Sequence, residues 1–291
     1  MRLPLLLAAA AAFSVLGAPA VAADRYWPPI TDPPTNAYQP GRWVWADLVT
    51  SDVGAAAEFY GKVLGWTFAT TGGADDRDTY TVVYANGLPI GGMVFPAEKV
   101  RDPKAAARWI GFISVPDVTR ASAAVETAGG KVIMKPRKLG TRGDAAVFAD
   151  PEGAPFGVIH SAVGDPEDYF GDEREWMWIE LWATNADRMG EFYRAVGGYD
   201  VEPVRDAGPR TQLRLKAGDR YRAGIMSKLD VGVRSTWLPY VRVASVAETV
   251  ARAREAGGRI MLAPTHAHGT NVAVIIDPTG APFAVAELPG K

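Results

Sequence analysis

The sequence predicts an α+β protein of four modules, each with the order strand, helix and three strands, arranged as two tandem domains. The first observation behind this prediction is an internal repeat, in which short motifs recur in the same order roughly 130 residues apart. The second is the length of 291 residues, which is enough for two domains of ordinary size. The motifs of the first copy are Trp45 to Leu48, Glu58 to Tyr60, Ala128 to Lys131 and Asp150 to Phe156, and those of the second are Trp178 to Leu181, Glu191 to Tyr193, Ala256 to Arg259 and Asp277 to Phe283.

Residues 1–23 predict a secretory signal peptide. A positive start at Arg2 precedes the apolar run Leu5–Leu16, and Ala20 to Ala22 fits the small-x-small cleavage pattern. The run is too short, and too interrupted by glycine and proline, for a membrane anchor. We therefore expect a secreted or periplasmic protein that has no membrane contact once the signal is removed.

Composition narrows the class of protein and its partners. Hydrophobic residues make up 48% of the chain and charged residues 22%, which is typical of a globular protein with real cores. A net charge of -2 with mixed signs gives no reason to expect nucleic acid as a partner. The chain has no cysteine, which excludes disulfides and a lipid anchor on cysteine. The composition does not decide whether the chain forms homo-oligomers.

Residues 24–40 form a proline-rich N-terminal arm, whose aromatic residues indicate that it packs on the body in places. The first domain, residues 41–162, opens with a strand from Arg42 whose alternation places Trp43, Trp45 and Asp47 on one face. A helix follows after Ser51-Asp52 and ends at Gly65, and the second module starts at Trp109 with its helix cap near Asp117. Further strands are expected at 67–70, 80–84, 91–95, 131–135, 145–149 and 156–160.

An acidic linker, residues 163–175, precedes the second domain, residues 176–291. The opening strand runs from Trp176 to Thr184, the first helix stops at Gly197-Gly198, and the last module starts at Trp237. A helix is expected at 246–256 and further strands at 212–216, 222–227, 259–262, 271–276 and 283–287.

Three features together resemble the vicinal oxygen chelate superfamily, which includes glyoxalases, bleomycin resistance proteins and extradiol dioxygenases. They are the motif Asp-x-x-x-Ala-x-x-Phe-Tyr-x-x-x-Leu-Gly from Asp52 to Gly65, helices that end in Ala-Gly-Gly, and Asp-Pro-x-Gly turns before the last strands. The resemblance covers nearly the whole mature chain and is strongest to two-domain glyoxalase-like proteins. It implies sheets that curl into half-open barrels around cavities that hold a metal or a ligand.

The resemblance also implies where a metal would bind, and the residues there are unsuitable. Metal-using members carry His, Gln or Glu at the start of each module's first strand and on its last strand, whereas a metal needs about three or four protein ligands. We therefore expect no metal and no cofactor, although Gln212 stands alone as an available ligand. The corresponding positions hold Trp45, Ile110, Gly157, Trp178, Leu238 and Ala284.

Aromatic side chains replace the metal ligands. Seven of the nine tryptophans fall on the opening strands of the modules. Alternation places Trp45 beside Asp47 and Trp178 beside Glu180, and an indole wall with a carboxylate suits a planar or cationic small molecule. We predict these four as ligand-binding residues. The alternative is that the tryptophans fill a core and the acids pair with Arg or Lys.

The sequence leaves enzymatic activity undecided and identifies no catalytic residue. The first hypothesis is an exported, metal-free protein that binds a small molecule in aromatic-lined cavities. The second is a metal-dependent lyase, isomerase or dioxygenase with a non-standard site that draws on Gln212, the two acids or the pair His266 and His268. His160 is expected on the strand face that points away from the cavity. The third hypothesis is an interaction scaffold that docks a partner through the arm.

Overall fold

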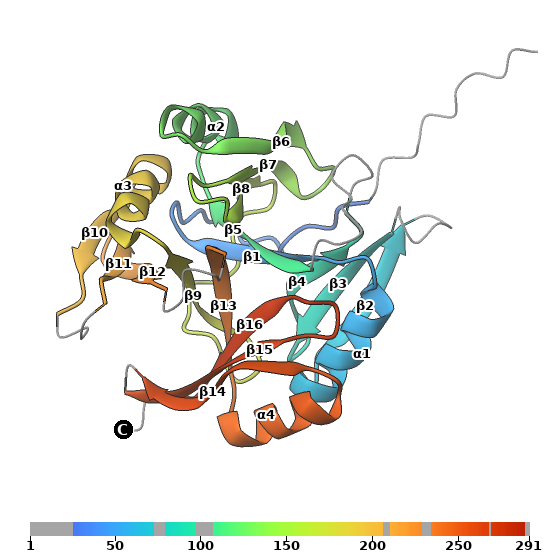
Figure 1. The fold of residues 1–291 in the computed structure, drawn as a ribbon. Helices are drawn as coiled ribbons and strands as arrows, with labels where there is room; N and C mark the ends of the chain where they lie inside the picture. The colour runs from blue at the N-terminus through green and yellow to red at the C-terminus, as the bar shows by residue number, and fades with distance from the viewer. Residues whose placement is uncertain are drawn as a thin grey trace, which may run out of the picture.

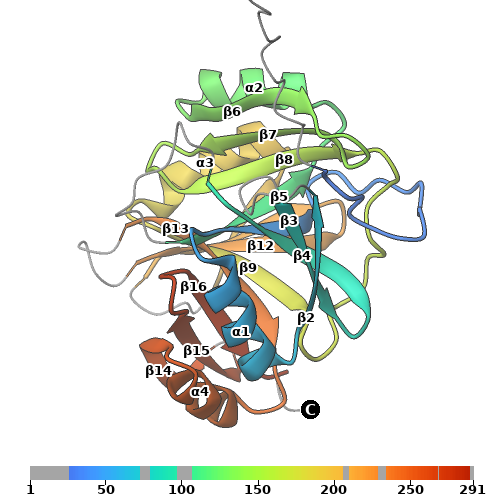
Figure 2. The ribbon, with the colours of Figure 1, turned by 90° about the vertical axis from the view of Figure 1, so that its right-hand side faces the viewer.

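The structure is a computed structural model that describes residues 26–72, 79–96, 107–205, 210–228, 234–267 and 269–288. Within these residues, the predicted order of strand, helix and three strands occurs four times, in two eight-stranded sheets (Figures 1 and 2). The predicted signal peptide lies outside the described residues. None of the helices in the described part of the chain is long and apolar enough to cross a membrane.

The first sheet has the order β2-β3-β4-β1-β5-β8-β7-β6, and the first strands of its two modules, β1 and β5, pair antiparallel at its centre. β1 also pairs in parallel with β4 of its own module. The elements are β1 (Trp43–Val49), α1 (Val53–Leu64), β2 (Thr67–Gly72), β3 (Thr79–Ala85), β4 (Leu88–Val94), β5 (Arg108–Ser114), α2 (Val118–Thr127), β6 (Lys131–Lys138), β7 (Gly143–Ala149) and β8 (Pro155–Ser161).

The second sheet repeats this arrangement in the order β10-β11-β12-β9-β13-β16-β15-β14. The four-residue strand β10 was not predicted, because so short a segment shows too little alternation to be recognised. The elements are β9 (Trp176–Ala183), α3 (Ala186–Gly197), β10 (Asp200–Pro203), β11 (Gln212–Ala217), β12 (Arg220–Ser227), β13 (Thr236–Arg242), α4 (Val246–Glu255), β14 (Arg259–Ala267), β15 (Thr270–Ile276) and β16 (Pro282–Ala286).

Local sequence sets the helix boundaries. The side chain of Asp52 accepts a hydrogen bond from the Ala55 amide at 2.8 Å, and Asp117 caps α2 in the same way. At the other ends of α1 and α3, Gly65 and Gly198 adopt the left-handed conformation with φ of 69° and 68°. The predicted caps and stops of these helices are therefore confirmed.

The two domains pack through the sides of the sheets that carry helices. α1 lies against α4 and α2 against α3, as both ribbon views show. One core joins the first and fourth modules and another joins the second and third. The opposite side of each sheet, here called its inner face, points away from these shared cores.

Two hydrogen-bonded chains cross the domain interface and mirror each other. The indole of Trp109 donates to the hydroxyl of Tyr60 at 2.7 Å, and this hydroxyl donates to Asp277 of the other domain at 3.0 Å. In the mirror chain, the indole of Trp237 donates to Tyr193, which donates to a carboxylate oxygen of the first domain's Asp-Pro turn at 3.1 Å. Each repeated tyrosine therefore fastens its helix to the terminal turn of the opposite domain.

The same carboxylates organise the turns that carry them. Asp150 accepts the amide hydrogens of Glu152 and Ala154, both at 2.9 Å, through its other oxygen. Burial raises the pKa of Asp150 to about 6, against the opposing effect of these amides and of the Tyr193 hydroxyl. Asp277 accepts from the Thr279 and Ala281 amides in the same pattern.

One predicted strand face was wrong. The pairing of β1 with β5 shifts register between Trp43 and Trp45, which is a β-bulge around Val44. The extra residue turns Trp43 to the side of the sheet that faces the second domain, where its ring lies 4.4 Å from that of Trp237. Trp45 stays on the inner face with Asp47.

We predict that Tyr60→Phe and Tyr193→Phe each lower the free energy of unfolding by about 1–3 kcal/mol, because each leaves a buried indole N–H and a carboxylate oxygen without their partner. Urea denaturation of the variants checks this. Tyr221→Phe is the control, since this tyrosine is 42% exposed and donates to Glu202 on the surface, outside the shared cores. Variants as stable as the wild type would show that the two chains do not hold the domains together.

Candidate functional site

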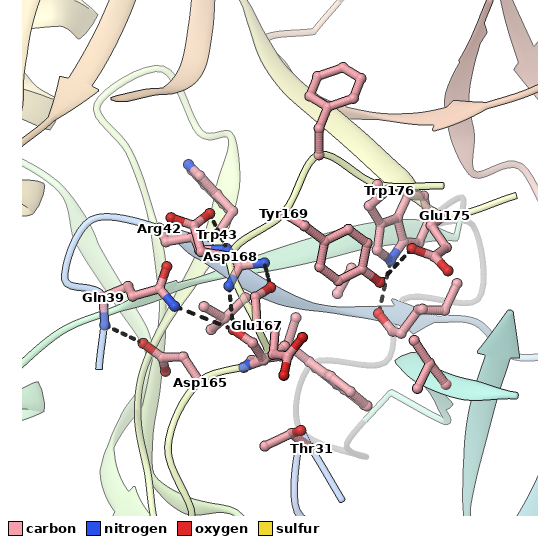
Figure 3. Close-up of a pocket in the computed structure, with 18 of the residues that line it drawn as sticks. Thr31, Gln39, Arg42, Trp43, Asp165, Glu167, Asp168, Tyr169, Glu175 and Trp176 are labelled. Atoms are coloured by element: carbon pink, nitrogen blue, oxygen red, sulfur yellow. Dashed lines mark hydrogen bonds and ion pairs between the residues drawn. The ribbon is translucent and has the colours of Figure 1, made fainter. Parts of the chain in front are cut away.

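A groove of about 1060 Å³ opens where the two domains, the arm and the linker meet (Figure 3). Its lining comes from the arm between Thr31 and Gln39, the first residues of β1, β4, β9 and β12, and the linker between Asp165 and Gly171. The groove is therefore built by both halves of the repeat and not by the inner face of one sheet.

Asp168 of the linker forms ion pairs with arginines of both domains. Its carboxylate forms two hydrogen bonds with Arg222, at 2.8 and 2.9 Å, and lies 3.5 Å from Arg42 and 3.4 Å from Arg220. Burial acts to raise the pKa of Asp168, but the hydrogen bonds from Arg222 and the charges of Arg42 and Arg220 outweigh it and hold the pKa below its usual range. Arg42 also donates to the carbonyl oxygens of Pro166 and Glu167, so the linker is fixed to both domains.

The walls of the groove are aromatic. Trp45 of the first domain and Trp178 of the second occupy equivalent positions in the repeat and both border it, Trp178 with a partly exposed side chain and Trp45 with only 3% of its surface exposed. Trp43 and Trp176 contribute as well. The rim carries four large apolar or aromatic side chains that are 42–56% exposed, namely Leu88, Tyr169, Phe170 and Tyr221.

Asp47 lies behind Trp45, away from the groove lining. Its Oδ1 accepts from the Trp45 indole at 2.8 Å and from the Tyr80 hydroxyl at 2.6 Å, and its Oδ2 lies 3.2 Å from Arg142. The Arg142 and Asp47 side chains are only 1% and 6% exposed, so they form a buried ion pair. Of the two alternatives left open by the sequence, the structure shows pairing with arginine for Asp47.

The N-terminal arm completes this cluster. The Arg142 guanidinium lies 5.1 Å from the Trp27 ring and donates to the carbonyl oxygen of Pro28 at 3.1 Å. Ile30 is fully buried among the inner-face residues of the first sheet. The first inner face is thus filled by the chain's own arm, and the predicted packing of the arm on the body is confirmed.

Glu180 has a different environment on the inner face of the second sheet. One of its carboxylate oxygens accepts from the Tyr240 hydroxyl at 3.0 Å and from the Trp182 indole at 3.2 Å. Glu180 is 7% exposed and, like Asp47, does not line the groove. The structure therefore brings Trp45 and Trp178 together in one groove and leaves the two predicted acids in separate clusters behind them.

The positions at which the family holds a metal do not fit one here. A Cβ on Gly157 would lie 2.3 Å from the Phe112 ring, and a Cβ on Gly92 would lie 1.8 Å from the Tyr80 hydroxyl, so aromatic groups fill this part of the first inner face. In the second sheet, Leu238 and Ala284 are buried in an apolar cluster. Among the residues that the structure describes, no group of three or more His, Cys, Asp or Glu side chains is placed to hold a metal ion.

The remaining candidate ligands lie apart from one another. His266 is exposed on β14, with Nδ1 3.4 Å from the Asn271 side chain, and His268 lies outside the described residues. Gln212 begins β11 and pairs with Met226. His160 stacks on Tyr38 of the arm with ring centroids 4.9 Å apart.

Sequence reasoning missed two buried carboxylates of the groove, Asp165 and Glu175. Both belong to the linker, 163–175, whose acidity was noticed only as a feature of a connecting segment. The acidity of this linker could have indicated site residues, because a linker beside aromatic strand ends can supply charged side chains to a site between domains.

Sequence comparison finds two matching family profiles. The profile described as Glyoxalase/Bleomycin resistance protein/Dioxygenase superfamily matches residues 42–158, and the profile described as Glyoxalase-like domain matches residues 177–286. The anthracycline biosynthesis protein DnrV of Streptomyces peucetius is 32% identical over 264 residues, which cover 86% of this chain and 94% of DnrV. CFP32 of Mycobacterium tuberculosis, named as a candidate glyoxylase, is 28% identical over 87% of this chain and 97% of its own length.

Solved structures share the fold at low sequence identity. The Mn(II)-bound glyoxalase from Novosphingobium aromaticivorans has a TM-score of 0.57 and 20% identity, with 87% of this chain and 84% of that chain covered. The 2,3-dioxygenase LapB from Pseudomonas sp. KL28 has a TM-score of 0.56 and 14% identity, with 86% and 92% covered. These likenesses concern the arrangement of the strands and helices.

We predict that Asp47→Asn lowers the free energy of unfolding by about 3–5 kcal/mol, because it leaves the buried Arg142 guanidinium without its counter-ion. The double variant Asp47→Asn with Arg142→Met removes both charges and should lose less than the single variant. Denaturant unfolding measures both. If Asp47→Asn is as stable as the wild type, the ion pair has no structural role.

Proposed function

This chain belongs to the glyoxalase, bleomycin resistance protein and dioxygenase superfamily, and we propose that it is an exported member that binds a small molecule, without a metal ion, in the groove between its domains. The observation that carries the proposal is that partly exposed tryptophans of both repeats, the equivalent pair Trp43 and Trp176 together with Trp178, line the same groove. Large indole surfaces around a concavity suit a flat organic molecule.

The residues at the family's metal positions support binding over metal catalysis. An indole N–H, an aliphatic side chain and a glycine donate no electron pair to a cation, whereas the family's His, Gln and Glu do. Tyr80 and Phe112 occupy the adjoining space in the first domain.

The enzyme alternative draws support from the names of the relatives. DnrV is named for anthracycline biosynthesis and CFP32 as a candidate glyoxylase, so a lyase, isomerase or dioxygenase with a non-standard site remains the second candidate. The third hypothesis, a scaffold that docks a partner through the arm, has less support. Ile30 and much of Trp27 are buried against the first domain, which makes them unavailable to a partner.

Export rests on the N-terminal pattern of Arg2, the apolar run and Ala20 to Ala22. N-terminal sequencing of the protein from its native source tests it. A mature chain that starts near Ala23 or Asp24 supports export, whereas a chain that retains Met1 contradicts it.

We expect a panel of flat aromatic compounds to contain ligands that quench the tryptophan fluorescence of the protein. Trp178→Phe should weaken their binding by about 1 kcal/mol or more, because it removes part of the indole wall. Trp182→Phe is the matched control, since Trp182 lies on the same strand but outside the groove. If no compound binds, or if both variants bind like the wild type, the groove is not the ligand site.

We also expect the purified protein to contain no stoichiometric divalent metal, and chelation to leave its melting temperature unchanged. A metal bound to the folded state would stabilise it by mass action, so its removal would be visible. Elemental analysis combined with thermal unfolding measures both quantities. One equivalent of Zn, Ni, Fe or Mn, lost together with stability, would favour the enzyme alternative.

A further inference from the structure

We propose that the groove selects an aromatic cation, and that Asp165 and Glu175 are the residues that recognise its positive charge. The proposal rests on the binding function proposed above and adds the chemical class of the ligand. It moves the selection of charge from Asp47 and Glu180, which lie outside the groove lining, to two carboxylates of the linker.

Asp165 is a fully buried carboxylate with an incomplete set of partners. Its Oδ2 accepts from the backbone amide of Gln39 and from the hydroxyl of Ser114, both at 2.7 Å. Its Oδ1 has no hydrogen-bond partner among the described residues. The side-chain oxygen Oε1 of Gln39, which also lines the groove, is a second buried acceptor without a partner there.

Glu175 is also buried, at 4% exposure, and the donors that hold it among the described residues are neutral. The Tyr169 hydroxyl donates to it at 2.6 Å, the Asn86 side chain at 3.0 Å and the Asp172 amide at 3.1 Å. Figure 3 shows Asp165 beside Gln39 on one side of the groove and Glu175 beside Tyr169 and Trp176 on the other.

The arginines of the groove form their ion pairs with a different acid, although the charge of Asp165 also acts to raise the pKa of Arg42. Arg42, Arg220 and Arg222 all form ion pairs with Asp168, and within the described part of the chain no ion pair involves Asp165 or Glu175. A buried carboxylate without a cation is costly, and a bound cation removes that cost. The part of the groove beside these two acids therefore favours a positively charged molecule over a neutral one.

The aromatic surface next to Glu175 specifies the rest of the ligand. The indole of Trp176 is fixed by a hydrogen bond of 2.8 Å to the carbonyl oxygen of Ile90, so its ring is already oriented before a ligand arrives. Trp178 and the exposed rings of Tyr169 and Phe170 line the same space. Aromatic faces attract organic cations, and their effect adds to that of the carboxylates.

The test compares proflavine, which is cationic at neutral pH, with acridine, a neutral compound of similar shape, in calorimetric titrations of the full mature protein. Proflavine should bind at least about tenfold more tightly than acridine, and added salt should reduce this preference. Asp165→Asn and Glu175→Gln should each weaken proflavine binding while leaving acridine binding unchanged. Glu173→Gln, which removes an exposed acid from the same linker, is the matched control.

Equal affinity for the two probes, or acid variants that bind proflavine like the wild type, would overturn the charge selection while leaving small-molecule binding intact. Absence of binding for both probes also overturns it, and the broader fluorescence panel then decides whether the groove binds anything. Because the comparison of the two probes on the wild type needs no variant, the proposal stays testable even if Asp165→Asn does not fold.

Discussion

The packing of the two domains depends on the paired Trp–Tyr–Asp chains. Tyr60 and Tyr193 lie on the first helix of each domain, and each hydroxyl accepts from a tryptophan of its own domain and donates to an aspartate of the other. A buried phenol or carboxylate without its partner is expensive, so helix must face helix across the interface. The inner faces of both sheets consequently point away from the shared cores. The space that remains between the domains is bordered by the arm and the linker. The groove is a product of that arrangement.

The duplicated domains have diverged in what occupies their inner faces. In the first, the buried pair of Arg142 and Asp47, together with Ile30 of the arm, fills the sheet with the chain's own side chains. In the second, Glu180 accepts hydrogen bonds from Tyr240 and Trp182, and the buried apolar cluster is smaller. Among the four residues predicted to bind a ligand, the equivalent Trp45 and Trp178 are the two that border the groove. The site proposed for ligand contact therefore lies in one shared groove and not in two separate cavities.

Most of the fold could be predicted because its signals are local. Alternation marks the strands, and Asp52, Asp117 and Gly65 mark the helix ends within a few residues of where they act. The predictions that failed also have physical reasons. A one-residue bulge at Val44 reversed the face of Trp43, which no count of alternating residues can detect. For the site, strand periodicity identified the two tryptophans of the groove, but not the partner of Asp47, which lies 95 residues away in sequence. The sequence did not indicate the linker acids as site residues, because the position of the linker depends on ion pairs between Asp168 and arginines of both domains.

The misfit of the first domain's inner face to a metal ion comes from a coordinated set of residues, and single substitutions cannot remove it. Tyr80 fits on the inner face only because residue 92 is glycine, and Phe112 fits only because residue 157 is glycine. A histidine in place of Trp45 would therefore find no partner ligands at positions 92 and 157, because Tyr80 and Phe112 fill the space that their side chains would need. It would also remove the indole that donates to Asp47 and leave the Arg142 guanidinium nearby, whose charge opposes a divalent cation. The aromatic filling, the buried ion pair and the inserted arm support one another, so a metal site would require the removal of all three.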